Sequence, residues 1–200
     1  GSVSPDGIGG EEALRRFADV IVPATRALGH HMNLAFVPSA PTPASLTFDL
    51  AVSAAEIFAG NWESGAGAIH AENQALRWLA DLAAFPADAG GTFVQGATVG
   101  NLSALAAARE RARTQLGVEP RRWAFAATAE AHSSIRSAAR VLDVAVVDVP
   151  GDERGRMTGE ALASALASAS EVTVFAVVAT GGTTNASAAG PVPSTAANRT

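Results

Sequence analysis

The fold is decided by residues 172–180, VTVFAVVAT, a continuous apolar run of β-prone residues. Two shorter runs of the same kind, 123–128 and 145–149, precede it, and segments with helical spacing lie between the runs at 132–142 and 158–167. A strand that is apolar along its whole length has both faces buried, which is typical of sheets that carry helices on either side. The sequence therefore predicts an α/β fold with a mixed, mostly parallel sheet and helices on both faces.

The chain before this region is predicted to be helical. Apolar spacing indicates helices at 11–28, at 43–59 with Thr42 as cap and Gly60 as terminator, and at 68–84. We expect a buried stripe on the second of these helices, formed by Leu46, Leu50, Ala54, Ile57 and Phe58. Prolines at 38, 41 and 43 predict that the connection from residue 30 to 43 is an extended loop.

Composition excludes several classes of protein. The 200 residues carry a net charge of -5 without a basic stripe, so no nucleic-acid partner is expected. No apolar stretch reaches the roughly 18 residues of a membrane span, and residues 1–12 do not resemble a signal peptide, so we expect a cytoplasmic protein without membrane contact. Cysteine is absent, and all 14 basic residues are arginine, so the chain contains no lysine.

A glycine-rich segment at 91–105 is the first candidate site. It reads as a short strand at 91–95, a loop, and a helix from about 101 to 115. Small residues at Gly96, Ala97 and Gly100 allow a ligand to approach the backbone, Thr98 adds a hydroxyl, and a helix start favours phosphate. The spacing matches neither G-x-G-x-x-G nor G-x-x-x-x-G-K-[ST]. A tight turn that binds no ligand is an equally good interpretation of this segment alone.

Two further candidates follow predicted strands, where open α/β sheets bind ligands. His132 begins the helix at 132–142 and could stack on a flat ring or simply cap the helix. Residues 179–185, ATGGTTN, place hydroxyls and glycines after the last strand, although they also fit an ordinary loop. No G-x-S-x-G motif supports a serine hydrolase. No metal site is expected, because His30 and His31 are adjacent and His70 lacks a second histidine at helical spacing.

Taken together and in this order, these segments resemble the group II pyridoxal-phosphate (PLP) amino-acid decarboxylases from about residue 17 to 191. Residues 91–101, GTFVQGATVGN, resemble that family's phosphate loop, His132 matches the histidine that stacks on the cofactor ring, and residues 179–184 match a segment near the cofactor. The resemblance implies that His132 is catalytic. It also implies a set of cofactor-binding residues: Gly96, Ala97, Thr98, His132, Thr180, Thr183 and Thr184. The substrate side of the pocket would be lined by a loop that contains Phe36, Pro38, Ser39 and Pro41.

The resemblance further implies a type I PLP fold, with an N-terminal helix and substrate-side loop at 1–43 and an incomplete PLP-binding large domain at 44–200. The implied activity is decarboxylation of an L-amino acid by a homodimer. Because the family's cofactor-binding lysine has no counterpart here, we expect a longer or two-chain enzyme and no activity from this chain alone. Two alternatives stay open: another type I PLP enzyme, such as an aminotransferase or C–S lyase, and a non-catalytic α/β module that binds a phosphate ligand or a partner chain.

Overall fold

The computed structural model of the protein describes residues 5–33, 40–117 and 119–183. The chain divides into two compact units, residues 1–68 and 69–200. The expected division at residue 43, between a substrate-side segment and a PLP-binding domain, is drawn partly by function and stays a prediction. Within the part of the chain that the structure describes, no helix is both long and apolar enough to cross a membrane.

The first unit holds helix α1 (Gly10–Arg16), a π-helical turn η1 (Phe17–Ile21), helix α2 (Pro43–Ala55) and the start of α3 (Trp62–Leu82). The helix predicted to reach residue 28 ends at Ile21, because Pro23 has no N–H with which to continue the helical ladder. Thr42 does cap α2, as predicted: its hydroxyl accepts a hydrogen bond from the Ser45 amide at 3.2 Å.

The buried stripe predicted on α2 is wrong for the residues that the structure describes. Leu46 is 57% exposed and Leu50 is 72% exposed, and α2 contains no buried residue. The helix also ends four residues early, because Glu56 adopts the left-handed conformation that closes a helix. The apolar spacing of α2 correctly indicates a helix, but spacing alone cannot say whether another element covers that face.

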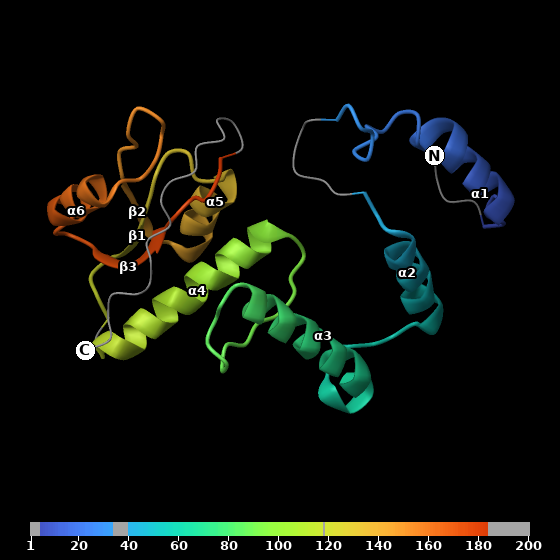
Figure 1. The fold of residues 1–200 in the computed structure, drawn as a ribbon, viewed down its shortest axis with the longest axis horizontal. Coiled ribbons are helices and arrows are strands. Elements are labelled where there is room, and N and C mark those ends of the chain that lie inside the picture. The colour runs from blue at the N-terminus through green and yellow to red at the C-terminus, as the bar shows by residue number, and fades with distance from the viewer. Residues whose placement is uncertain (1–4, 34–39, 118, 184–200) are drawn as a thin grey trace. The chain divides into compact units, whose positions relative to one another are not determined.

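The second unit is built on a parallel sheet of β1 (Trp123–Ala127), β2 (Ala145–Asp148) and β3 (Thr173–Val178) (Figure 1). The strand order is β2-β1-β3, so β1 is central. Every pairing among these described strands is parallel, so the antiparallel member expected of a mixed sheet is not among them. All three strands therefore end at the same edge of the sheet.

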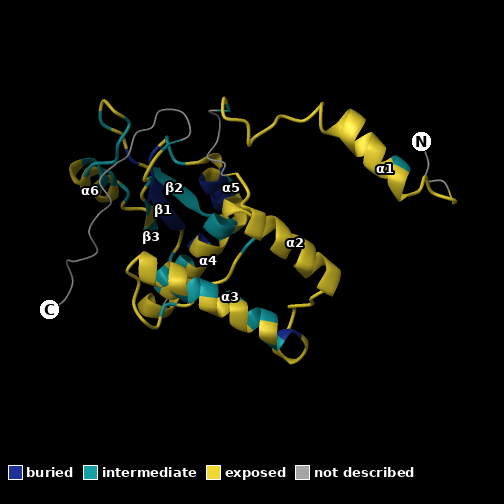
Figure 2. Ribbon diagram, turned by 45° about the vertical axis from the view of Figure 1, so that its right-hand side comes forward, coloured by how far each residue is buried: buried dark blue, intermediate teal, exposed yellow. Residues whose placement is uncertain are grey.

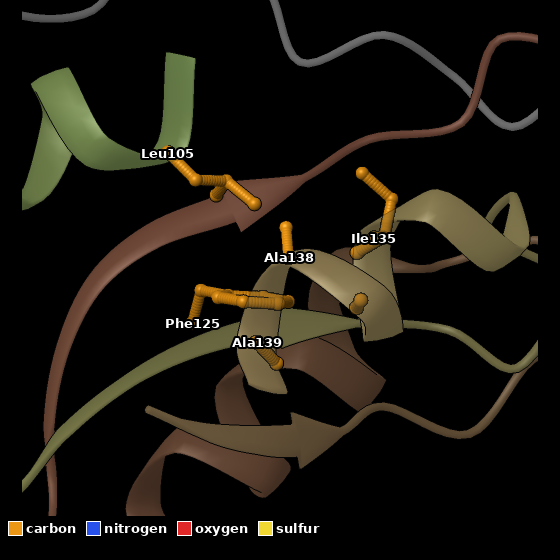
Figure 3. Packing of buried hydrophobic residues seen from close by; sticks show 6 residues of the cluster. Leu105, Phe125, Ile135, Ala138 and Ala139 are labelled. Atoms are coloured by element: carbon orange, nitrogen blue, oxygen red, sulfur yellow. The ribbon is translucent and has the colours of Figure 1, made fainter. Parts of the chain in front are cut away.

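Three helices cover the sheet: α4 (Ala97–Leu116), α5 (Ser133–Leu142) and α6 (Gly159–Ser168). One face of β1 packs into a cluster of Leu105, Phe125, Ala127, Ile135, Ala138 and Ala139 (Figure 3). Ala124 and Ala126 point to the opposite face and are also fully buried, so both faces of β1 are covered. Figures 1 and 2 show α5 and α6 on opposite sides of the strands, in agreement with the prediction of helices on both faces.

Two boundaries differ from the sequence prediction near the glycine-rich segment. Residues 91–95 do not form a strand, because the Phe93 amide donates to a side chain of α3 and not to a neighbouring strand. Helix α4 begins at Ala97 and not near residue 101, so Thr98 lies in its first turn. Helix α3 also begins earlier than residue 68, with a break in its helical backbone at Gly65.

Candidate active site

The amino end of α4 presents unpaired backbone amides. Gly96 precedes the helix with φ 84° and ψ 159°, and no side chain caps the helix. The first helical hydrogen bond there runs from the Gly100 amide to the Gly96 carbonyl at 3.2 Å. The amides of Ala97, Thr98 and Val99 precede that bond, so they are free to bind an anion, and the helix dipole favours negative charge at this end.

A carboxylate of α3 fixes the segment that leads into α4. Oε1 of Glu72 accepts hydrogen bonds from the Phe93 amide at 2.9 Å and from the Thr92 hydroxyl at 3.4 Å. The Gly96 amide then donates to the Val94 carbonyl at 2.8 Å, which closes a tight turn. Sequence reasoning missed Glu72, because nothing local connects it to a loop about twenty residues later in the chain.

His132 lies directly before α5 and caps it. Its Nδ1 atom accepts a hydrogen bond from the Ser134 amide at 3.2 Å and lies 2.8 Å from the Ser134 hydroxyl. The backbone of His132 is extended, and its side chain is exposed to solvent. The interpretation of His132 as a helix cap is therefore confirmed, and the exposed ring leaves a role in stacking open at the same time.

Two hydrogen bonds tie α4 to α5. Near the amino ends, Nδ2 of Asn101 donates to the Ser134 hydroxyl at 2.9 Å. Farther along, the guanidinium of Arg109, in the middle of α4, donates to the carbonyl of Leu142, the last residue of α5, at 2.8 Å. The helix start that carries Thr98 and the helix start that carries His132 are therefore held next to each other. Asn101 and Ser134 were not predicted as site residues, although both stand in the motifs that drew attention to this region.

Thr180 and Thr183 follow β3 at the carboxyl edge of the sheet. Ala127 of β1 pairs with Val178 of β3, so the segments that leave these two strands begin at the same edge. His132 follows β1 and Thr180 follows β3, and both therefore leave the sheet at the edge where ligands bind in open α/β folds. The structure thus brings the His132 and Thr180 segments to one edge.

The turn after β2 is fixed by an ion pair at that edge. Asp152 accepts hydrogen bonds from the Arg156 guanidinium at 2.8 Å and from the Arg154 and Arg156 amides at 2.9 Å. The Arg156 guanidinium is the main cause of the lowered pKa of the Asp152 carboxyl, which falls from 3.8 to about 2. The two amides contribute to this lowering. A Cβ atom on Gly155 would lie 3.3 Å from the Glu130 side chain, so this turn contacts the segment that leads to His132.

Several predicted site residues are not placed at this edge. Phe36, Pro38, Ser39 and Thr184 lie outside the described residues. Pro41 belongs to the first unit and is exposed. Among the residues that the structure describes, no group of three or more histidine, aspartate or glutamate side chains is gathered as a metal site would require.

Relatives of known name support one family. Over 171 residues the chain is 34% identical to L-2,4-diaminobutyrate decarboxylase of Rhizobium meliloti (strain 1021), which covers 82% of this chain and 34% of that protein. Over 164 residues it is 31% identical to aromatic-L-amino-acid decarboxylase of Bacillus atrophaeus, covering 80% of this chain and 34% of the relative. The chain thus spans about a third of the length of these curated relatives.

A solved structure shares the fold. The crystal structure of Oryza sativa TDC with PLP and tryptamine superposes with a TM-score of 0.81 at 23% identity, covering 96% of this chain and 45% of that chain. This likeness confirms the predicted type I α/β fold. The family model of the pyridoxal-dependent decarboxylase conserved domain matches residues 11–192. The resemblance read from three short motifs is thereby confirmed, and the chain belongs to the pyridoxal-dependent decarboxylase family.

Proposed function

We propose that the protein decarboxylates an L-amino acid with PLP, and that this chain supplies the part of the site that binds the cofactor's phosphate and ring. The observation that carries the proposal is the pairing of two helix starts at one end of the unit. The uncapped start of α4 and the His132 cap of α5 are linked through Asn101 and Ser134.

The residues present fit a flat cofactor that bears a phosphate. A Cβ atom added to Gly96 would meet no atom within 4 Å, so the backbone there is open to a ligand. Gly96, Ala97 and Thr98 would bind the phosphate through backbone amides and the Thr98 hydroxyl. Of the segment after β3, Thr180, Thr183 and Thr184 would supply hydroxyl groups beside the cofactor.

His132 would lie against the cofactor ring, because its imidazole is exposed while its Nδ1 atom is held by α5. When bound, PLP supplies the electron sink that stabilises the electrons left behind by the departing carboxylate. The chain's own contribution is to bind and orient: amides on the phosphate, an imidazole on the ring, and threonines at the sheet edge.

The chain contains no lysine, so the residue that holds PLP covalently has to come from a segment beyond these 200 residues or from a second chain. We therefore expect this chain to be inactive by itself. We also propose a cytoplasmic homodimer, with Phe36, Pro38, Ser39 and Pro41 on the substrate side of the site.

The test uses the protein expressed from its complete gene and loaded with PLP. We expect release of CO₂ from an L-amino acid, and the relatives make 2,4-diaminobutyrate and the aromatic amino acids the first substrates to try. Production of an oxo acid without CO₂ would identify an aminotransferase instead. If no amino acid reacts although PLP binds, the proposed activity is wrong.

Two substitutions test the site itself. Thr98→Val removes a hydroxyl from a charged phosphate, worth about 1.5–3 kcal/mol, so we expect PLP to bind about 10- to 150-fold more weakly. Thr114→Val is the matched control, because Thr114 lies on the same helix and its hydroxyl only donates to the Glu110 carbonyl. His132→Ala is compared with His70→Ala, which changes another exposed histidine. Equal PLP binding by all four variants and the parent would contradict the assignment.

A further inference from the structure

We propose that Asn101 and Ser134 are positioning residues that fix the tautomer of His132, with its ring proton on Nε2. The inference deepens the proposed function, on which its catalytic meaning rests.

The three side chains form one continuous hydrogen-bonded chain. Asn101 Nδ2 lies 2.9 Å from Ser134 Oγ, and Ser134 Oγ lies 2.8 Å from His132 Nδ1. The middle member is buried, since Ser134 is only 4% exposed. Water therefore has little access to the hydroxyl, and its partners are the two side chains that flank it.

The direction of each hydrogen bond follows from what each atom can do. Asn101 Nδ2 can only donate, so Ser134 Oγ accepts from it. The single hydroxyl proton of Ser134 is then left for its other neighbour, His132 Nδ1. Nδ1 also faces the Ser134 backbone amide at 3.2 Å, which can only donate. Two donors meet one ring nitrogen, so Nδ1 has to be an acceptor.

A proton on Nδ1 would set an N–H group against the N–H of Ser134, which is unfavourable. The neutral ring therefore carries its proton on Nε2, on the far side of the imidazole. Among the described residues, Nε2 has no hydrogen-bond partner, so its N–H is available to a bound molecule. Asn101, which acts on His132 only through the Ser134 hydroxyl, thus adds a second donor to the one that the Ser134 amide already directs at Nδ1.

An isosteric substitution at Asn101 should reverse the direction of the hydrogen bond between residue 101 and Ser134. In Asn101→Asp a carboxylate oxygen takes the place of Nδ2 and can only accept, so the Ser134 hydroxyl proton turns toward residue 101. His132 Nδ1 then loses its hydroxyl donor and faces a lone pair of Ser134 instead. We expect the ratio of Nδ1–H to Nε2–H forms to rise at least about fivefold, because a hydrogen bond is lost on one side and gained on the other.

The experiment is nitrogen NMR of the protein expressed from its complete gene, without cofactor and with ¹⁵N-labelled histidine rings. His132→Gln assigns the His132 signals. In the parent protein we expect Nδ1 to show the shift of an unprotonated ring nitrogen and Nε2 that of an N–H. Ser134→Ala should weaken this preference, and Ser137→Ala, on the same helix, should leave it unchanged.

A parent protein with the proton on Nδ1 would overturn the inference, as would an Asn101→Asp variant whose His132 shifts equal the parent's. Because the measurement is made without PLP and without turnover, it separates the two proposals. The expected shifts in a protein that releases no CO₂ would uphold the tautomer and reject the proposed activity. Conversely, an active decarboxylase with the other tautomer would reject only the positioning role.

Discussion

Gly96 is the residue at which a single methyl group should disturb the phosphate site most selectively. Its φ of 84° and ψ of 159° lie in a region of backbone conformation that only glycine adopts readily. A Cβ atom there would meet no atom within 4 Å, so Gly96→Ala introduces no clash. The whole cost is backbone strain, which for such a conformation is about 1–3 kcal/mol.

This strain can lower either the stability of the protein or its affinity for PLP. If the backbone keeps its conformation, the free energy of unfolding falls by about 1–3 kcal/mol. If the backbone relaxes, the amides at the start of α4 turn away from the phosphate, and the Kd for PLP rises by about 5- to 150-fold. The two effects together should account for the full cost.

The assay combines urea unfolding of the cofactor-free protein with PLP titration, both on the protein from its complete gene. Gly67→Ala is the control: Gly67 also has open space around its Cβ position, but it lies inside α3 without a positive φ. Alanine there should leave PLP binding unchanged and stabilise the helix by up to about 1 kcal/mol. A Gly96→Ala variant with the parent's stability and the parent's affinity would show that Gly96 carries no backbone strain and does not shape the phosphate site.

Three further predictions concern the support of the site. Phe125→Ala should lower the free energy of unfolding by about 3–5 kcal/mol, because Phe125 is fully buried, whereas Phe48→Ala at a 70% exposed position should change it by less than about 0.5 kcal/mol in urea unfolding. Glu72→Ala should raise the Kd for PLP about fivefold by releasing the Phe93 amide, and Glu72→Gln, which keeps an acceptor, should restore most of the affinity; equal affinities would contradict the role of Glu72. The Asp152 carboxyl has its pKa lowered to about 2 in the folded protein, so its stabilising effect is present above about pH 4 and lost as the pH falls toward 2. The stability difference between the parent and Asp152→Asn should therefore shrink over that range, and a difference independent of pH would contradict the ion pair.

The sheet and its helices could be predicted because their signals are local. The apolar run at 172–180 predicted β3 to within two residues at each end, and Thr42 was correctly predicted to cap a helix. His132 was found for the same reason: it stands where a strand ends and a helix begins, and both boundaries are visible in the sequence.

What could not be predicted depends on contacts between distant residues. The segment 91–95 has β-prone composition, yet the Glu72 carboxylate takes the Phe93 amide that a strand would have used. The hydrogen bond between Asn101 and Ser134 joins residues 33 positions apart and leaves no periodic trace. The apolar face of α2 illustrates the same limit, because helical spacing cannot show that Leu50 is exposed.

The start of α4 and the His132 cap of α5 are proposed to form one cofactor site. The most direct test is a crystal structure, with PLP bound, of the protein expressed from its complete gene. We expect the phosphate within hydrogen-bond distance of the Ala97 and Thr98 amides, and the imidazole of His132 stacked on the cofactor ring. A phosphate bound elsewhere, with the start of α4 left in solvent, would contradict the proposed site.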